Sequence, residues 1–173
     1  MLIFARADWG RFHLKNPEKN NQPQTVLFAE GETNPAQGLF AYEQYWTAQG
    51  YTAIAGTDEA GRGPLAGPVV AAAVILPVGL DIPHLNDSKQ VSPKRREILF
   101  EIIRAKAVAS AWSQVGPADI DRLNIYQAAR VAMMQALAGL PRPFDLVLSD
   151  AMPLPDLAVP CLPIIHGDAR SAS

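Results

Sequence analysis

Two adjacent acidic residues, Asp58 and Glu59, stand directly before a glycine-rich stretch that contains Gly61, Arg62 and Gly63. Neighbouring side chains on a regular strand point to opposite faces, so these two carboxylates can converge only if the strand breaks at this point. Glycine permits such a break, and its bare backbone lets a ligand approach the peptide groups closely. The stretch therefore predicts a corner at which two carboxylates meet a substrate.

A third carboxylate could join this corner. Asp150 ends another apolar run, and it reaches the same site if its strand lies beside that of Asp58. Clustered carboxylates repel one another, and hard divalent cations with oxygen ligands relieve that repulsion, so we expect Mg²⁺ or Mn²⁺ as the cofactor. Three acids on two strand ends can begin to hold two metal ions about 4 Å apart for phosphodiester hydrolysis.

Each of these features has a simpler explanation when it is taken by itself. An Asp-Glu pair is commonly a solvated strand end, and a Gly-Arg-Gly sequence is commonly only a turn. A hydrolase that acts on sugars also uses two carboxylates, but it needs neither the glycine corner nor a metal, so activity that survives a chelator would favour it. The combination of features at the end of a buried strand favours the metal site.

The composition is that of a single globular domain, with 173 residues, 49% hydrophobic and 18% charged. Cys161 is the one cysteine and cannot form an internal disulfide, which favours a reducing compartment. The first residues lack the apolar core of a signal peptide, and no apolar run is long enough to span a bilayer. We therefore expect a soluble, cytoplasmic monomer without a membrane partner.

Apolar periodicity and breaker residues predict the elements that position the acids. Strands are expected at residues 52–58, 68–76, 108–115, 144–150 and 162–165, and the first and fourth of them end in aspartate. One helix is expected from Pro93 to about Ala105, and a second from residues 119–121 to Gly139. This order predicts an α/β fold with a mixed sheet and helices packed on it.

Several segments together resemble one known family. Residues 54–76 are similar to the first active-site motif of ribonuclease HII, the type 2 ribonuclease H family, and residues 86–89 (NDSK), 121–125 (DRLNI), Asp150 and residues 166–169 (HGDA) follow in the order that the family shows. The resemblance covers about residues 52–173. It implies the ribonuclease H-like fold, a mixed five-stranded sheet flanked by helices. It also implies endonucleolytic cleavage of RNA in RNA·DNA hybrids, and incision of duplex DNA 5′ of an embedded ribonucleotide.

The resemblance also implies roles for individual residues. Asp58 would bridge two metals, Glu59 and Asp150 would each help to hold one, and the Gly-Arg-Gly corner would meet the 2′-hydroxyl that distinguishes RNA from DNA. A metal-activated water would attack the phosphate, so no protein nucleophile is needed. The formal charge of −2 argues against a nucleic-acid partner, but the protein becomes positive once two divalent cations are counted.

Residues outside the first motif carry less specific expectations. Lys89 and residues 94–96 (KRR) form the densest basic cluster and are expected to contact the nucleic-acid backbone, although a solvated helix start explains them equally well. Asp168 and His166 are expected to lie next to the metal ligands and to hold them in position, or to form only a turn. Asn124 is expected to position the second helix rather than to touch substrate.

The family pattern continues past Ser173. It includes a further helix with a fourth metal-binding aspartate and, beyond it, a tyrosine that stacks near the ribonucleotide junction. The family usually has glycine after the strand aspartate, where this chain has Ala151. We therefore expect residues 51–173 to be a ribonuclease H type 2 domain without its C-terminal part, and residues 1–50 to be an unmatched, poorly ordered extension. Two hypotheses follow: an active endonuclease, or an inactive remnant that at most binds hybrid duplex.

Overall fold

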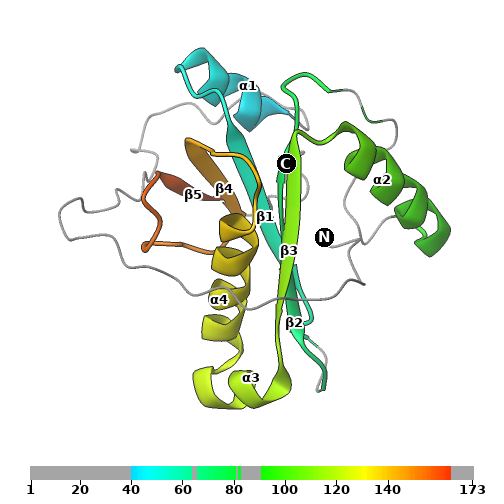
Figure 1. The fold of residues 1–173 in the computed structure, drawn as a ribbon, viewed down its shortest axis with the longest axis vertical. Coiled ribbons are helices and arrows are strands. Elements are labelled where there is room, and N and C mark those ends of the chain that lie inside the picture. Colours follow the sequence, from blue (N-terminus) through cyan, green and yellow to red (C-terminus); the bar gives the residue numbers. More distant parts are fainter. Residues whose placement is uncertain (1–39, 64–65, 81, 83–90, 165–173) are drawn as a thin grey trace.

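The computed structural model describes residues 40–63, 66–80, 82 and 91–164. In this part of the chain five strands form one sheet in the order β3-β2-β1-β4-β5 (Figure 1). The strands are β1 (Ile54–Ala60), β2 (Val69–Ile75), β3 (Ala109–Val115), β4 (Leu146–Asp150) and β5 (Cys161–Ile164). β2 pairs antiparallel with β1 and β3, whereas β4 pairs parallel with β1 and β5. The predicted mixed five-stranded sheet is confirmed.

The described residues also form helices α1 (Ala41–Ala48), α2 (Pro93–Lys106), α3 (Pro117–Leu123) and α4 (Ile125–Ala138). The prediction of a single helix from residues 119–121 onward is wrong, because the chain turns sharply at Asn124, which has a φ of 70°. The Asn124 side chain accepts a hydrogen bond from the Gln127 backbone N–H at 3.0 Å, and this caps the start of α4. Asn124 thus positions α4, as expected.

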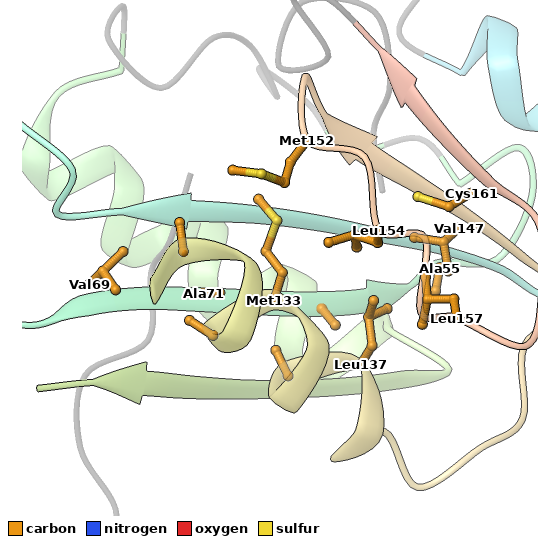
Figure 2. Packing of buried hydrophobic residues seen from close by; sticks show 14 of the residues in the cluster. Ala55, Val69, Ala71, Met133, Leu137, Val147, Met152, Leu154, Leu157 and Cys161 are labelled. Carbon is orange, nitrogen blue, oxygen red and sulfur yellow. The ribbon is translucent and has the colours of Figure 1, made fainter. Parts of the chain in front are cut away.

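One face of the sheet is covered by α4 (Figure 2). Side chains alternate along a strand, and this places the buried residues of β2 at every second position on that face. Met133 and Leu137 are fully buried between α4 and the sheet, in one cluster with Ala55 and Val147. The small alanines of α4 allow close approach to the strands; they are Ala128, Ala129, Ala132 and Ala136.

The other face of the sheet carries α1 and α2. Tyr42 of α1 is buried among strand residues that include Ile54 and Leu146, so α1 packs on the sheet although the sequence analysis placed it in a poorly ordered extension. An apolar cluster made by Leu99 of α2 with Leu76, which follows β2, anchors that helix. None of the helices in the described ranges is long and apolar enough to cross a membrane.

Candidate active site

The carboxyl ends of β1 and β4 bring two aspartates to neighbouring positions. The strands are parallel, and their pairing runs as far as Thr57 opposite Ser149. Asp58 and Asp150 are the next residues on the two strands, so regular sheet spacing places their Cα atoms about 5 Å apart. The structure therefore sets these two acids side by side at one edge of the sheet, which is the arrangement on which the sequence hypothesis depended.

β1 continues two residues past its predicted end at Asp58, and the break lies within the glycine-rich corner, as predicted. Its pairing with β2 extends to Ala60, and the chain turns only at Gly61, which has a φ of 95°. Asp58 and Glu59 therefore keep the alternation of a regular strand and start from opposite faces. The Glu59 backbone N–H donates to Asp58 Oδ1 at 2.6 Å, which draws the Asp58 carboxylate toward the strand end.

Glu59 is the most perturbed acid of the site. Its side chain is only 9% exposed, Oε1 accepts a hydrogen bond from Arg62 Nη1 at 2.8 Å, and Oε2 is buried with no hydrogen-bond partner among the described residues. Burial raises the pKa of Glu59 above its ordinary 4.5, Arg62 lowers it, and the charges of Asp58 and Asp150 raise it further. The three carboxylates therefore share one electrostatic environment.

The carboxylates of Asp58, Glu59 and Asp150 suit a hard divalent cation by their oxygen atoms and by their charge. Carboxylate oxygens are the ligands that Mg²⁺ and Mn²⁺ prefer, and Glu59 Oε2 is a buried oxygen that lacks a compensating donor. In the described ranges, however, no group of three His, Cys, Asp or Glu side chains is arranged to hold a metal ion. Strand alternation and the bond to Arg62 explain why Glu59 does not converge with the two aspartates.

The two glycines of the corner differ in what requires them. A Cβ atom at Gly61 would lie 2.5 Å from the Pro68 carbonyl oxygen, and the φ of 95° is unfavourable for other residues, so β2 and the turn together require glycine there. A Cβ atom at Gly63 would meet no described atom within 4 Å. Gly61 is therefore explained by the fold, whereas no described atom requires glycine at position 63.

The chain also turns sharply after Asp150, and Ser149 holds this turn. Ala151 has a φ of 48°, a left-handed conformation in which glycine is usual. Ser149 is buried, and its hydroxyl donates to the Met152 carbonyl oxygen at 2.5 Å, while the Ala151 N–H donates to Ile164 at 3.0 Å. Ser149 was not among the predicted site residues, although a hydroxyl inside an apolar strand is a signal that could have identified it.

Other predicted site residues are not brought to this corner by any described contact. Lys89, His166 and Asp168 lie outside the described residues. Lys94 and Arg95 are exposed in the first turn of α2, and this helix is anchored beyond the end of β2, at the opposite end of β1 from the acids. Contact between the basic residues of α2 and a nucleic acid therefore stays a prediction.

Comparison with known proteins links these features to one family. The family profile for ribonuclease HII matches residues 55–167. A ribonuclease HII of Moorella thermoacetica is 51% identical over 143 residues, which are 83% of this chain and 69% of that protein. A ribonuclease HII of Desulfitobacterium hafniense is 48% identical over 82% of this chain and 55% of its own length. Many relatives are therefore matched over little more than half of their length.

A third relative extends the match toward the N-terminus. A ribonuclease HII of Leuconostoc mesenteroides is 46% identical over 163 of the 173 residues and is covered over 64% of its length. This match necessarily includes most of residues 1–50, which the sequence analysis expected to be unmatched. The crystal structure of the ribonuclease H2 from Pyrococcus horikoshii OT3 matches 68% of this chain and 64% of that chain, with a TM-score of 0.58 and 23% identity, which supports the fold. On the family profile and these identities, the chain belongs to the ribonuclease HII family.

Proposed function

We propose that this chain carries the carboxylates of an endoribonuclease site that acts by metal-dependent phosphodiester hydrolysis. Its substrates would be the RNA strand of RNA·DNA hybrids and ribonucleotides embedded in duplex DNA, with incision on the 5′ side. The observation that carries the proposal is the parallel register of β1 and β4, which places Asp58 and Asp150 at adjacent strand ends. Family membership supports the class of substrate.

Three acids would hold the divalent cations. Asp58, with Glu59 next to it in the chain and Asp150 next to it in the sheet, would contribute to both ions, and Glu59 and Asp150 would each contribute to one. Bound divalent cations supply an activated water and stabilise the leaving 3′-oxygen. Burial, together with the charges of Asp58 and Asp150, raises the pKa of Glu59, and this makes the cluster receptive to positive charge.

Recognition of the ribonucleotide is assigned to the backbone of the corner. A Cβ atom at Gly63 would meet no described atom within 4 Å, which supports a role in which a 2′-hydroxyl donates to and accepts from the peptide groups there. Gly61 contributes indirectly, because it lets β1 turn directly beside β2 and so sets the position of residues 62 and 63. A larger residue at position 63 would obstruct this approach without disturbing the fold.

The direct test incubates the full chain with Mn²⁺ and a DNA duplex that contains a single ribonucleotide. We expect a nick on the 5′ side of the ribonucleotide, complete loss of nicking with a chelator, and a loss of at least about 100-fold in Asp58→Asn. Asp119→Asn is the matched control, because Asp119 is an exposed acid of α3 that pairs with Arg122. Nicking that survives the chelator or the Asp58→Asn substitution would contradict the proposal.

A second candidate is a chain that binds hybrid duplex without cleaving it. The observation that favours it is that no three potential ligands within the described ranges are arranged around a cation. In that case a gel-shift titration would detect binding of hybrid duplex, while no nick would form with either Mn²⁺ or Mg²⁺. Nicking at a rate typical of a whole enzyme would exclude this candidate.

A further inference from the structure

The guanidinium of Arg62 occupies one oxygen of Glu59 and leaves the other without a partner. Arg62 Nη1 lies 2.8 Å from Glu59 Oε1, while Oε2 is buried and accepts no hydrogen bond from the described residues. The two partners differ in exposure, since the Glu59 side chain is 9% exposed and that of Arg62 is 44% exposed. A buried carboxylate is therefore partly neutralised by a cation that reaches it from the solvent side.

The charges around Glu59 make this pairing significant. Burial raises the pKa of Glu59, and the charges of Asp58 and Asp150 add to the rise, whereas the hydrogen bond and the charge of Arg62 lower it. Arg62 thus does for Glu59 what a bound divalent cation would do, because both stabilise the ionised carboxylate. A cation that binds Oε2 alone would leave the bond to Arg62 in place, whereas a cation that also needs Oε1, or that draws the carboxylate toward the two aspartates, must displace Arg62.

We propose that Arg62 is an internal counter-ion that competes with the divalent cation for Glu59. This inference rests on the proposed function, in which Glu59 is a metal ligand. Binding of a cation would then release the half-exposed Arg62 guanidinium, which lies next to Gly63 in the chain. In the substrate-free protein, Arg62 lowers the affinity for the cation.

The test measures Mn²⁺ binding to the full chain without nucleic acid, from the electron paramagnetic resonance signal of free Mn²⁺. Arg62→Ala is expected to bind Mn²⁺ about 5-fold more tightly than the unmodified chain, the fold-change of a modest, partly exposed ion pair. Arg122→Ala is the matched control, because Arg122 makes a similar pair three residues from its partner, Asp119, at 2.7 Å on α3. It removes the same net charge, and its affinity should stay within about 2-fold of the unmodified chain.

Two further variants keep the result interpretable. Arg62→Lys retains the charge but loses the planar guanidinium, so its affinity should fall between those of the unmodified chain and Arg62→Ala. Arg62→Gln has a similar length without the charge and replaces the alanine variant if circular dichroism shows that Arg62→Ala is misfolded. An affinity in the neutral variants that is equal to that of Arg122→Ala, or weaker, overturns the inference.

Failure of the inference can be told apart from failure of the proposed function. If Asp58→Asn weakens Mn²⁺ binding while Arg62→Ala leaves it unchanged, the metal site stands and only the counter-ion role is wrong. If Asp58→Asn binds Mn²⁺ as tightly as the unmodified chain, or if no variant binds it, the proposed metal site fails, and the counter-ion role fails with it.

Discussion

The two ends of the β1–β4 strand pair carry carboxylates in opposite environments. At the amino end, Asp145 accepts hydrogen bonds from the Thr52 N–H at 2.8 Å, the Thr52 hydroxyl at 3.0 Å and the Ala53 N–H at 3.0 Å. Burial acts to raise the pKa of Asp145, but these hydrogen bonds outweigh it and hold the pKa below its ordinary 3.8. Asp145 therefore joins two strands that are far apart in sequence.

At the carboxyl end, Glu59 has too few donors for its charge. One of its oxygens is bonded to Arg62, the other is buried without a partner, and two aspartates stand nearby, so its pKa is raised. The comparison shows that the same kind of side chain stabilises the fold where donors surround it and opposes folding where they do not. A carboxylate that lacks donors and destabilises the fold is expected where the group is retained for chemistry.

The largest effect on stability is expected from Gly61→Ala, which would disrupt the carboxyl end of the β1–β4 strand pair. The added Cβ would lie 2.5 Å from the Pro68 carbonyl oxygen, and the alanine would have to keep a φ of 95°. Chemical denaturation should show a loss of about 3 kcal/mol in the free energy of unfolding. Gly63→Ala is the control and should cost less than about 0.5 kcal/mol, because its Cβ meets no described atom. Equal costs would show that the corner does not depend on the close approach to β2.

Asp145→Asn is expected to weaken the contacts at the amino end of the β1–β4 strand pair. It removes the charge and one acceptor from a carboxylate that holds three hydrogen bonds, and it should cost about 1.5 kcal/mol at neutral pH. The folded pKa lies below the unfolded one, so the stabilisation is complete above the unfolded value of about 3.9 and is lost as the pH falls through the folded pKa. Unfolding measured across this range should show the difference shrink on acidification.

A stabilising effect is expected from Glu59→Gln when a chelator is present. A raised folded pKa means that stability is fully present below the unfolded value of about 4.5 and is lost as the pH rises through the folded pKa. Glutamine removes that loss, so the variant should gain about 1 kcal/mol at neutral pH while it loses the proposed nuclease activity. Destabilisation at neutral pH would show that the Arg62 pair outweighs the burial of the charge.

The smallest effect is expected from Ala151→Gly, at the turn that follows the other acid of the carboxyl end. Ala151 has a φ of 48°, where an L-residue is strained, and glycine should raise stability by about 0.5 kcal/mol after its greater unfolded-state entropy is counted. Ala60→Gly, in a paired strand position, is the control and should lower stability by about 0.5–1 kcal/mol. A loss in both variants would show that the Ser149 and Ile164 hydrogen bonds relieve the strain at Ala151.

The parts of the fold that depend on local signals could be predicted from the sequence. Alternating or apolar runs located all five strands to within about two residues, and Pro93 marked the start of α2. The division at Asn124 was missed, because the apolar positions on α3 and α4 continue past it and only its φ of 70° reveals the turn. Asp145 was missed because its partners Thr52 and Ala53 are more than 90 residues away in the chain.

The amino-acid sequence by itself determined which residues are available for chemistry, namely two apolar runs that lead to an aspartate, an adjacent glutamate and a glycine-rich corner. Only the tertiary structure decided that β1 and β4 are parallel neighbours in register, and therefore that Asp58 and Asp150 meet. It also decided that the Glu59 side chain is only 9% exposed and is bonded to Arg62. Residue types and local periodicity act over a few positions, whereas strand pairing, burial and charge coupling arise only when distant segments pack together.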